Sequence, residues 1–199
     1  MMLILLSKNK EIIKKYLKQN SNIGFIATAS ELEENRDYMY QDREDLSQMN
    51  YKVIEIDISK ESKQDILKKF KIVDSIFVAG GNSFYLLQQL KNKDVLLELK
   101  EFANNKIYIG SSAGACIACP SIEYAQKLDH KAQAPLLSNY KAMNLVEFYI
   151  LPHYKSKDKY TKLADEIEEE YMKYKFIKLS NNQAIVVDNI STYKVVETE

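Results

Sequence analysis

The sequence has no excess of charge of either sign, and it has no long hydrophobic run. Lysine plus arginine equals aspartate plus glutamate at 28 each, so the charge balance gives no reason to expect nucleic acid or an anionic membrane as a partner. No apolar stretch approaches the roughly 20 residues of a membrane-spanning helix. The short one at the start, MMLILLSKNK, is typical of a strand and not of a signal peptide. We therefore expect a cytoplasmic protein.

Cysteine is also scarce, with only Cys116 and Cys119. Their C-x-x-C spacing can mark a redox pair, but the pair lies in a run of small residues, SSAGACIACP, that predicts a tightly packed helix. Buried cysteines that fill small gaps are the better interpretation. The chain offers too few soft ligands at the right spacing for zinc, so we expect neither a metal nor another cofactor.

The 199 residues, 46% of them hydrophobic, suit one domain that spans residues 1–199. Short β-rich runs alternate with longer segments of helical period, which predicts a three-layer α/β/α fold around a mostly parallel sheet. The expected strands are Met2–Leu6, Ile23–Ala27, Lys52–Ile56, Ser75–Val78 and Ile107–Gly110. The expected helices lie near Lys8–Lys18, Ser30–Met49, Ser62–Phe70, Ser83–Leu90 and Val95–Ala103, with Ser30 and Ser62 as N-caps.

The remainder of the chain has a looser pattern. The stretch from Pro120 to Asn144 predicts a long loop of the kind that overhangs a site. A strand at Phe148–Leu151 and a charged helix near Tyr160–Tyr174 follow. The tail predicts two or three strands with turns at Asn181–Asn182 and Asp188–Asn189, so the sheet should end in antiparallel pairing.

The most informative segment is Gly110-x-Ser112-x-Gly114, which stands between a β-rich run and a run of small residues. This is the nucleophile-elbow pattern, in which a tight strand-to-helix turn projects a serine from the sheet edge. The helix start would aim its unpaired amides at the site, with the Ala113 N–H as the first oxyanion donor. Ser111 is a neighbouring hydroxyl for substrate contact. The alternative is a serine that merely caps an ordinary helix.

A second oxyanion donor is expected at the end of another strand, in FVAGGNS. Gly80 and Gly81 permit a turn with inward-facing N–H groups, and Gly81 is the expected donor. Gly80 and Asn82 are then candidates for substrate binding. A plain strand-to-helix turn is the alternative interpretation.

The search for a general base is short, because the chain holds only two histidines. His153 follows a predicted strand end at the same rim as the elbow, which fits the Ser–His pairing that activates a hydroxyl. His130 lies in a polar loop and should be solvated. The third group, which orients the imidazole, stays open at this point among Asn181, Asp188, Asp129 and Glu123.

Taken together, the segments FIATAS, FVAGGNSFYLLQQL, GSSAGACIACPSIEY, FYILPHY and LSNNQAIVV resemble the peptidase E family of aspartyl dipeptidases, with cyanophycinase as a more distant relative. The resemblance covers nearly the whole chain and implies a class I glutamine amidotransferase-like, flavodoxin-like arrangement. It implies Ser112 as nucleophile, His153 as base, and the Gly81 and Ala113 amides as oxyanion hole. The family's acidic third member falls where this chain has Asn181, unless a carboxylate such as Asp129 or Asp188 replaces it.

The resemblance also implies a small peptide as substrate, with aspartate at its amino terminus. Such a substrate needs a cation, and the only arginines are Arg36 and Arg43, both in the predicted helix after FIATAS. If neither reaches the site, a lysine or backbone amides must serve. Because Asn181 replaces an acid, the alternative function is an impaired homologue that binds a small molecule or peptide. Amidotransferase-like chemistry would need a thiol at the elbow, and Cys116 lies one helical turn away. A monomer or a homodimer is expected.

Overall fold

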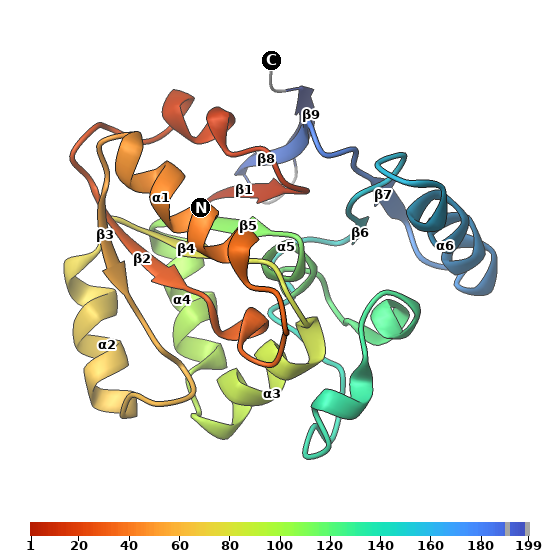
Figure 1. The fold of residues 1–199 in the computed structure, drawn as a ribbon, viewed down its shortest axis with the longest axis horizontal. Coiled ribbons are helices and arrows are strands. Elements are labelled where there is room, and N and C mark those ends of the chain that lie inside the picture. The colour runs from red at the N-terminus through yellow and green to blue at the C-terminus, as the bar shows by residue number, and fades with distance from the viewer. Residues whose placement is uncertain (190–191, 198–199) are drawn as a thin grey trace.

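A computed structural model describes residues 1–189 and 192–197, and its centre is a seven-stranded sheet in the order β3-β2-β4-β5-β1-β8-β9 (Figure 1). The first five of these strands in that order are parallel, whereas β8 pairs antiparallel with both β1 and β9. The mostly parallel α/β fold with antiparallel carboxyl-terminal strands is therefore confirmed. The strands are β1 (Met2–Leu6), β2 (Asn22–Ile26), β3 (Lys52–Glu55), β4 (Ser75–Val78), β5 (Ile107–Ser111), β8 (Gln183–Asn189) and β9 (Thr192–Glu197).

Helices cover both faces of this sheet, because the central strands are apolar on both sides. Along β1, Leu3 and Leu5 point into one buried cluster, and Ile4 and Leu6 point into the other. The first cluster holds the apolar faces of α2 (Lys63–Ile72), α3 (Ser83–Asn92), α4 (Leu96–Asn105) and α5 (Ala113–Cys116). The second cluster holds the short 3-10 helix Glu11–Lys15 and α1 (Asp37–Gln48).

The carboxyl ends of β1, β4 and β5 meet at one edge of the sheet. Leu6 is opposite Ser111 in the register, and Val78 is opposite Gly110. Whatever follows these three strands is therefore gathered at a single rim, which is where open α/β sheets place their binding sites.

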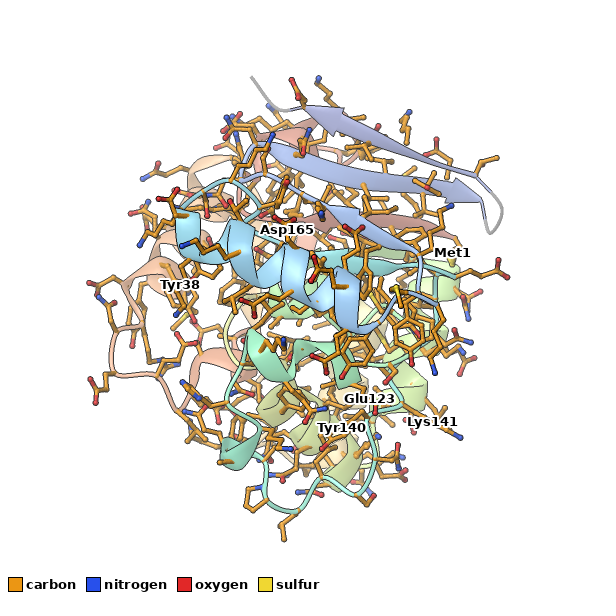
Figure 2. The ribbon with its side chains drawn as sticks, turned by 90° about the vertical axis from the view of Figure 1, so that its right-hand side faces the viewer. Met1, Tyr38, Glu123, Tyr140, Lys141 and Asp165 are labelled. Atoms are coloured by element: carbon orange, nitrogen blue, oxygen red, sulfur yellow. The ribbon has the colours of Figure 1, made fainter. Side chains whose placement is uncertain are left out.

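A second, two-stranded parallel sheet stands beside the first and consists of β6 (Tyr149–Leu151) and β7 (Phe176–Lys178). Between these strands runs α6 (Asp158–Glu170), which lies at one side of the molecule in Figure 1 and faces the viewer in Figure 2. Beside α6 in Figure 2 is the segment that carries Glu123, part of the long loop, which contains the 3-10 helices Glu123–Lys127 and Lys131–Gln133. Lys127 of this segment pairs with two glutamates of α6.

Several expected elements are shorter or begin elsewhere. The helix expected at Lys8–Lys18 is only the 3-10 helix Glu11–Lys15. Ser30 is not an N-cap: it ends the 3-10 helix Thr28–Ser30 and donates its hydroxyl hydrogen to the Ala27 carbonyl, so α1 begins later, at Asp37. Ser62 does cap α2, because its hydroxyl accepts a hydrogen bond from the Asp65 N–H. Asp188 and Asn189 belong to β8 instead of a turn, and residues 190–191 lie outside the described chain.

None of the helices formed by residues 1–189 and 192–197 is long and apolar enough to cross a membrane.

Candidate active site

Ser112 occupies a sharp turn between β5 and α5. Its φ of 49° and ψ of −107° lie in a region that residues with a Cβ rarely adopt. A Cβ on Gly110 would collide with the Gly114 carbonyl, so the strand and helix can pack this closely only without a side chain there. The Ser112 N–H donates to the Leu6 carbonyl at 3.0 Å, which ties the turn to the end of β1. The predicted elbow geometry is therefore present.

The His153 ring stands between Ser112 and Asn181. Its Nε2 is 2.9 Å from the Ser112 Oγ, and its Nδ1 is 2.8 Å from the Asn181 Oδ1. An amide oxygen only accepts, so Nδ1 carries the proton and Nε2 is left to accept from the serine hydroxyl. His153 lies two residues after the end of β6 and, like Ser112, has a positive φ, of 63°.

Burial lowers the pKa of His153 below its ordinary value of 6.5, and the positive charge of Lys8 lowers it further, against the hydrogen bond to Asn181, which raises it. The imidazole is therefore neutral at pH 7, which is the form that can accept a proton.

The backbone at Gly80, Gly81 and Ala113 lines the same cavity as the serine. Ala113 is the first residue of α5, so its N–H has no acceptor within that helix. Gly80 approaches from the end of β4, and a Cβ there would lie 3.3 Å from the Ser112 Cβ. Gly81 has a φ of 132°, and a side chain on it would collide with the Ala29 carbonyl. This backbone geometry requires glycine.

These residues surround one cavity of about 540 Å³. Its walls come from the ends of β1, β4 and β5, from α1, from the long loop, and from the segment that joins β6 to α6. Of the predicted site residues, it is lined by Gly80, Gly81, Ser111, Ser112, Ala113, Asp129, His153 and Asn181. The site residues that were predicted on separate segments of the sequence thus line the same cavity.

Comparison with known proteins adds to this geometry. The sequence model described as Peptidase family S51 matches residues 4–195. The chain belongs to peptidase family S51. An uncharacterized peptidase from Listeria innocua is 38% identical over 192 residues, which cover 93% of this chain and 91% of the relative. A peptidase E from a Nostoc species is 28% identical over 73% of this chain and 57% of its own length.

Solved structures show the same fold. The crystal structure of a peptidase E-type protein from Listeria monocytogenes has a TM-score of 0.89 and 35% identity, and the match covers 100% of this chain and 98% of that one. A peptidase from an acI-B1 Actinobacterium has a TM-score of 0.72 at 16% identity, which shows the fold alone. The S51 assignment therefore supports a peptidase-like function.

Asn82 of this S51 chain does not line the cavity, which corrects its predicted role in substrate binding. Its Oδ1 accepts the Tyr85 N–H at 2.9 Å and so caps α3. Its Nδ2 donates to the His130 carbonyl at 2.9 Å and to the Gln133 Oε1 at 2.8 Å. Its Oδ1 thus serves α3, and its Nδ2 holds the long loop against that helix.

Asp129 lines the cavity but is not the group beside the His153 Nδ1. Its Oδ2 accepts from the Ser83 N–H at 2.9 Å and from the Ser83 hydroxyl at 2.6 Å, at the start of α3. Burial raises the pKa of Asp129 to about 6, although these bonds oppose the shift. Glu123 and Asp188 are exposed. Of the four candidates, only Asn181 contacts the imidazole.

The arginines are not at the serine. Arg36 and Arg43 line another cavity, of about 210 Å³, between the ends of β2 and β3 and α1, where Arg43 pairs with Glu55. The cations that line the serine cavity are Lys8 and Lys157.

Several residues of the serine cavity were not found from the sequence, including Ser7, Lys8, Lys157 and Tyr160. Ser7 and Lys8 directly follow β1, so their position after a parallel strand was an available signal. Tyr160, whose ring centroid is 5.4 Å from that of His153, belongs to α6. No sequence pattern indicated that α6 would pack at this rim.

The cysteines do not supply reactive thiols. Both are buried and free, and burial raises the pKa of Cys119 to about 12 and that of Cys116 well above its ordinary value. Such thiols stay protonated and are poor nucleophiles. Among residues 1–189 and 192–197, no cluster of three or more His, Cys, Asp or Glu side chains is placed to hold a metal ion.

Proposed function

We propose that this protein hydrolyses small peptides through a covalent acyl-enzyme on Ser112. The observation that carries the proposal is the continuous chain of contacts from the Ser112 Oγ through His153 to the Asn181 Oδ1, at 2.9 and 2.8 Å. It opens into a cavity of about 540 Å³ beside the Ala113 and Gly81 backbone. A serine with a paired base and a nearby set of amides is the arrangement that acyl transfer requires.

In the acylation step, the His153 Nε2 takes the proton of the Ser112 hydroxyl as the Oγ attacks the substrate carbonyl carbon. The carbonyl oxygen then becomes an oxyanion, which the Gly81 and Ala113 N–H groups stabilise. The imidazolium returns its proton to the leaving amine, the C–N bond breaks, and an ester to Ser112 remains.

In the deacylation step, the neutral His153 takes a proton from water, whose oxygen attacks the ester carbon. The second tetrahedral intermediate breaks its bond to the Ser112 Oγ, which regains the proton from the imidazolium. The carboxylic acid leaves and the enzyme is regenerated. The reaction consumes only the peptide and one water molecule.

Asn181 limits the rate that the proposed mechanism can reach. Its Oδ1 holds the Nδ1–H tautomer that the reaction needs, but a neutral amide does not offset the charge of the imidazolium that forms. We therefore expect a lower turnover than a carboxylate would give. The same observation favours the second candidate function, a homologue that binds a peptide or other small molecule with little turnover.

The charges around the cavity bear on the substrate. Lys8 and Lys157 are available for a carboxylate, and Glu33 and Asp129 for an ammonium group. A short peptide with an acidic residue at its amino terminus carries both groups. Without an arginine at the cavity, a lysine would hold the acidic side chain as a point charge, so discrimination between Asp-X and other dipeptides should be modest.

Dipeptide hydrolysis tests the proposal. We expect wild-type protein to release amino acids from Asp-X dipeptides and the Ser112→Ala variant to lose that activity, with ligand binding retained. Ser21→Ala, which removes a half-buried hydroxyl that donates to the Lys18 carbonyl and does not line the cavity, should behave as wild type. Equal cleavage by wild type and Ser112→Ala would remove the acyl-enzyme mechanism, and dipeptide binding without cleavage by wild type would favour the binding protein.

A further inference from the structure

The last residue of β1 and the residue after it contact all three members of the proposed triad. The Leu6 carbonyl accepts the Ser112 N–H at 3.0 Å. The Ser7 Oγ accepts the His153 N–H at 2.7 Å, and it lies 3.4 Å from the Asn181 Oδ1. Ser7 is 1% exposed, so water does not readily replace these contacts. The end of β1 is thus a common anchor for residues that are far apart in the sequence.

The contact to His153 fixes a backbone that would otherwise relax. Ser112 and His153 both have a positive φ, at 49° and 63°, and such conformations persist only where the surroundings hold them. The Ser112 N–H is held by a main-chain carbonyl, which no substitution removes. The His153 N–H is held by a side-chain hydroxyl, so its anchor depends on the identity of residue 7.

The contact to Asn181 selects which end of the amide faces the imidazole. The Ser7 oxygen already accepts the His153 N–H, and its own hydrogen is free to point to the Asn181 Oδ1. A donor on that side favours the amide oxygen there and disfavours the NH₂ group. The oxygen in turn keeps the proton on the His153 Nδ1 and leaves Nε2 unprotonated toward Ser112.

We propose that Ser7 is a positioning residue that holds the His153 backbone and selects the Nδ1–H tautomer through Asn181. The kinetic part of this inference rests on the proposed serine mechanism. The part about the tautomer does not, because it concerns a proton that can be observed without turnover.

Two-bond ¹H–¹⁵N correlation spectra of the imidazoles test the tautomer directly. The chain has only two histidines, so a His130→Gln background leaves the signals of His153 alone. We expect wild type to show a protonated Nδ1 and an unprotonated Nε2 at neutral pH. In Ser7→Ala the two nitrogens should move toward each other in shift, as both tautomers become populated.

Kinetics of the same variants give the second readout. In Ser7→Ala we expect kcat to fall on the order of 10²-fold, the effect of misplacing a reacting group by about 1 Å, with KM changed far less. Ser7→Thr keeps the hydroxyl and should restore both the wild-type spectrum and most of kcat. Ser75→Ala is the matched control, because it also removes a buried serine hydroxyl, one without a hydrogen-bond partner in the described chain.

The outcomes separate the two proposals. A wild-type tautomer together with a wild-type kcat in Ser7→Ala would overturn the role of Ser7. Activity that survives in Ser112→Ala would instead overturn the serine mechanism and leave the tautomer result standing. If Ser7→Ala does not fold, Ser7→Cys is measured in its place, since a thiol is a weak hydrogen-bond partner and should give the same mixture of tautomers.

Discussion

At the scale of single residues, the environment of His153 determines the pH range in which the proposed mechanism can operate. Burial and the charge of Lys8 favour the neutral imidazole, and among the described residues the partner of its Nδ1 is the Asn181 amide and not a carboxylate. A base with a lowered pKa stays unprotonated in mildly acidic solution. It is also a weaker base toward the serine hydroxyl.

This environment predicts the pH dependence. Because the proposed mechanism uses the neutral form, kcat/KM should rise with pH through the pKa of His153, with a midpoint below 6.5, and then stay level toward neutral pH. Asn181→Asp places a negative charge at the Nδ1, which favours the imidazolium, so the midpoint should move upward by about one to three units.

The pH profiles of both proteins, together with NMR titration of His153, measure this shift. Asn182→Asp is the control, since it adds the same charge one residue away and should move the midpoint less. A midpoint in Asn181→Asp at or below that of wild type would contradict the assignment of His153 as the base.

At the scale of elements, the strands were easier to predict than the segments between them. β1 and β4 have the predicted bounds, because uninterrupted apolar runs mark buried parallel strands. The segment after β1 was predicted as a helix because Ile12, Ile13, Tyr16 and Leu17 recur on one face. Three of these residues are buried, and Tyr16 is half-buried. The backbone nevertheless forms only one short 3-10 helix, Glu11–Lys15.

A buried ion pair accompanies this departure from the predicted helix. The Lys10 ammonium lies 2.7 Å from Asp42 and 3.0 Å from Asp45, and the Lys10 and Asp42 side chains are only 8% and 11% exposed. The pair links residues 32 positions apart, so local periodicity could not reveal it.

Removing Lys10 should therefore be costly. Lys10→Ala leaves the Asp42 carboxylate buried without its cation, and we expect a loss of about 3 to 5 kcal/mol in the free energy of unfolding. Lys14→Ala removes an exposed pair with Glu11 and should cost less than about 1 kcal/mol. Urea denaturation measures both.

The same experiment at lower pH checks the cause. Burial already raises the pKa of Asp42 even with Lys10 present, and it should rise further without Lys10. A carboxyl group whose folded pKa is raised destabilises the fold as pH increases through that pKa, so the deficit of Lys10→Ala should shrink in acid. If Lys10→Ala instead loses the same free energy of unfolding at every pH, the cause is lost packing and not the unpaired charge of Asp42.

At the scale of the whole molecule, the sequence identified most of the candidate site but not how it is enclosed. Ser112, His153 and Gly81 were found because each follows a strand with a recognisable pattern. The carboxyl ends of β4 and β5 share one rim, whereas His153 follows β6 of the second sheet. The separate sheet of β6 and β7, and the position of α6 near the cavity, depend on packing between distant segments that no local pattern encodes. The third group stayed open for the same reason, since Asn181 is brought to His153 by the pairing of β7 with β6 and of β8 with β1.

The central claim is that the fold presents an activated serine at position 112. Labelling with a fluorophosphonate, followed by peptide mapping, tests it most directly, because the reagent needs a nucleophilic hydroxyl and an oxyanion hole but no knowledge of the substrate. We predict rapid stoichiometric labelling of Ser112 in wild type, and labelling slowed by orders of magnitude in His153→Ala. No labelling of wild type, or labelling of Ser111 in place of Ser112, would contradict the account.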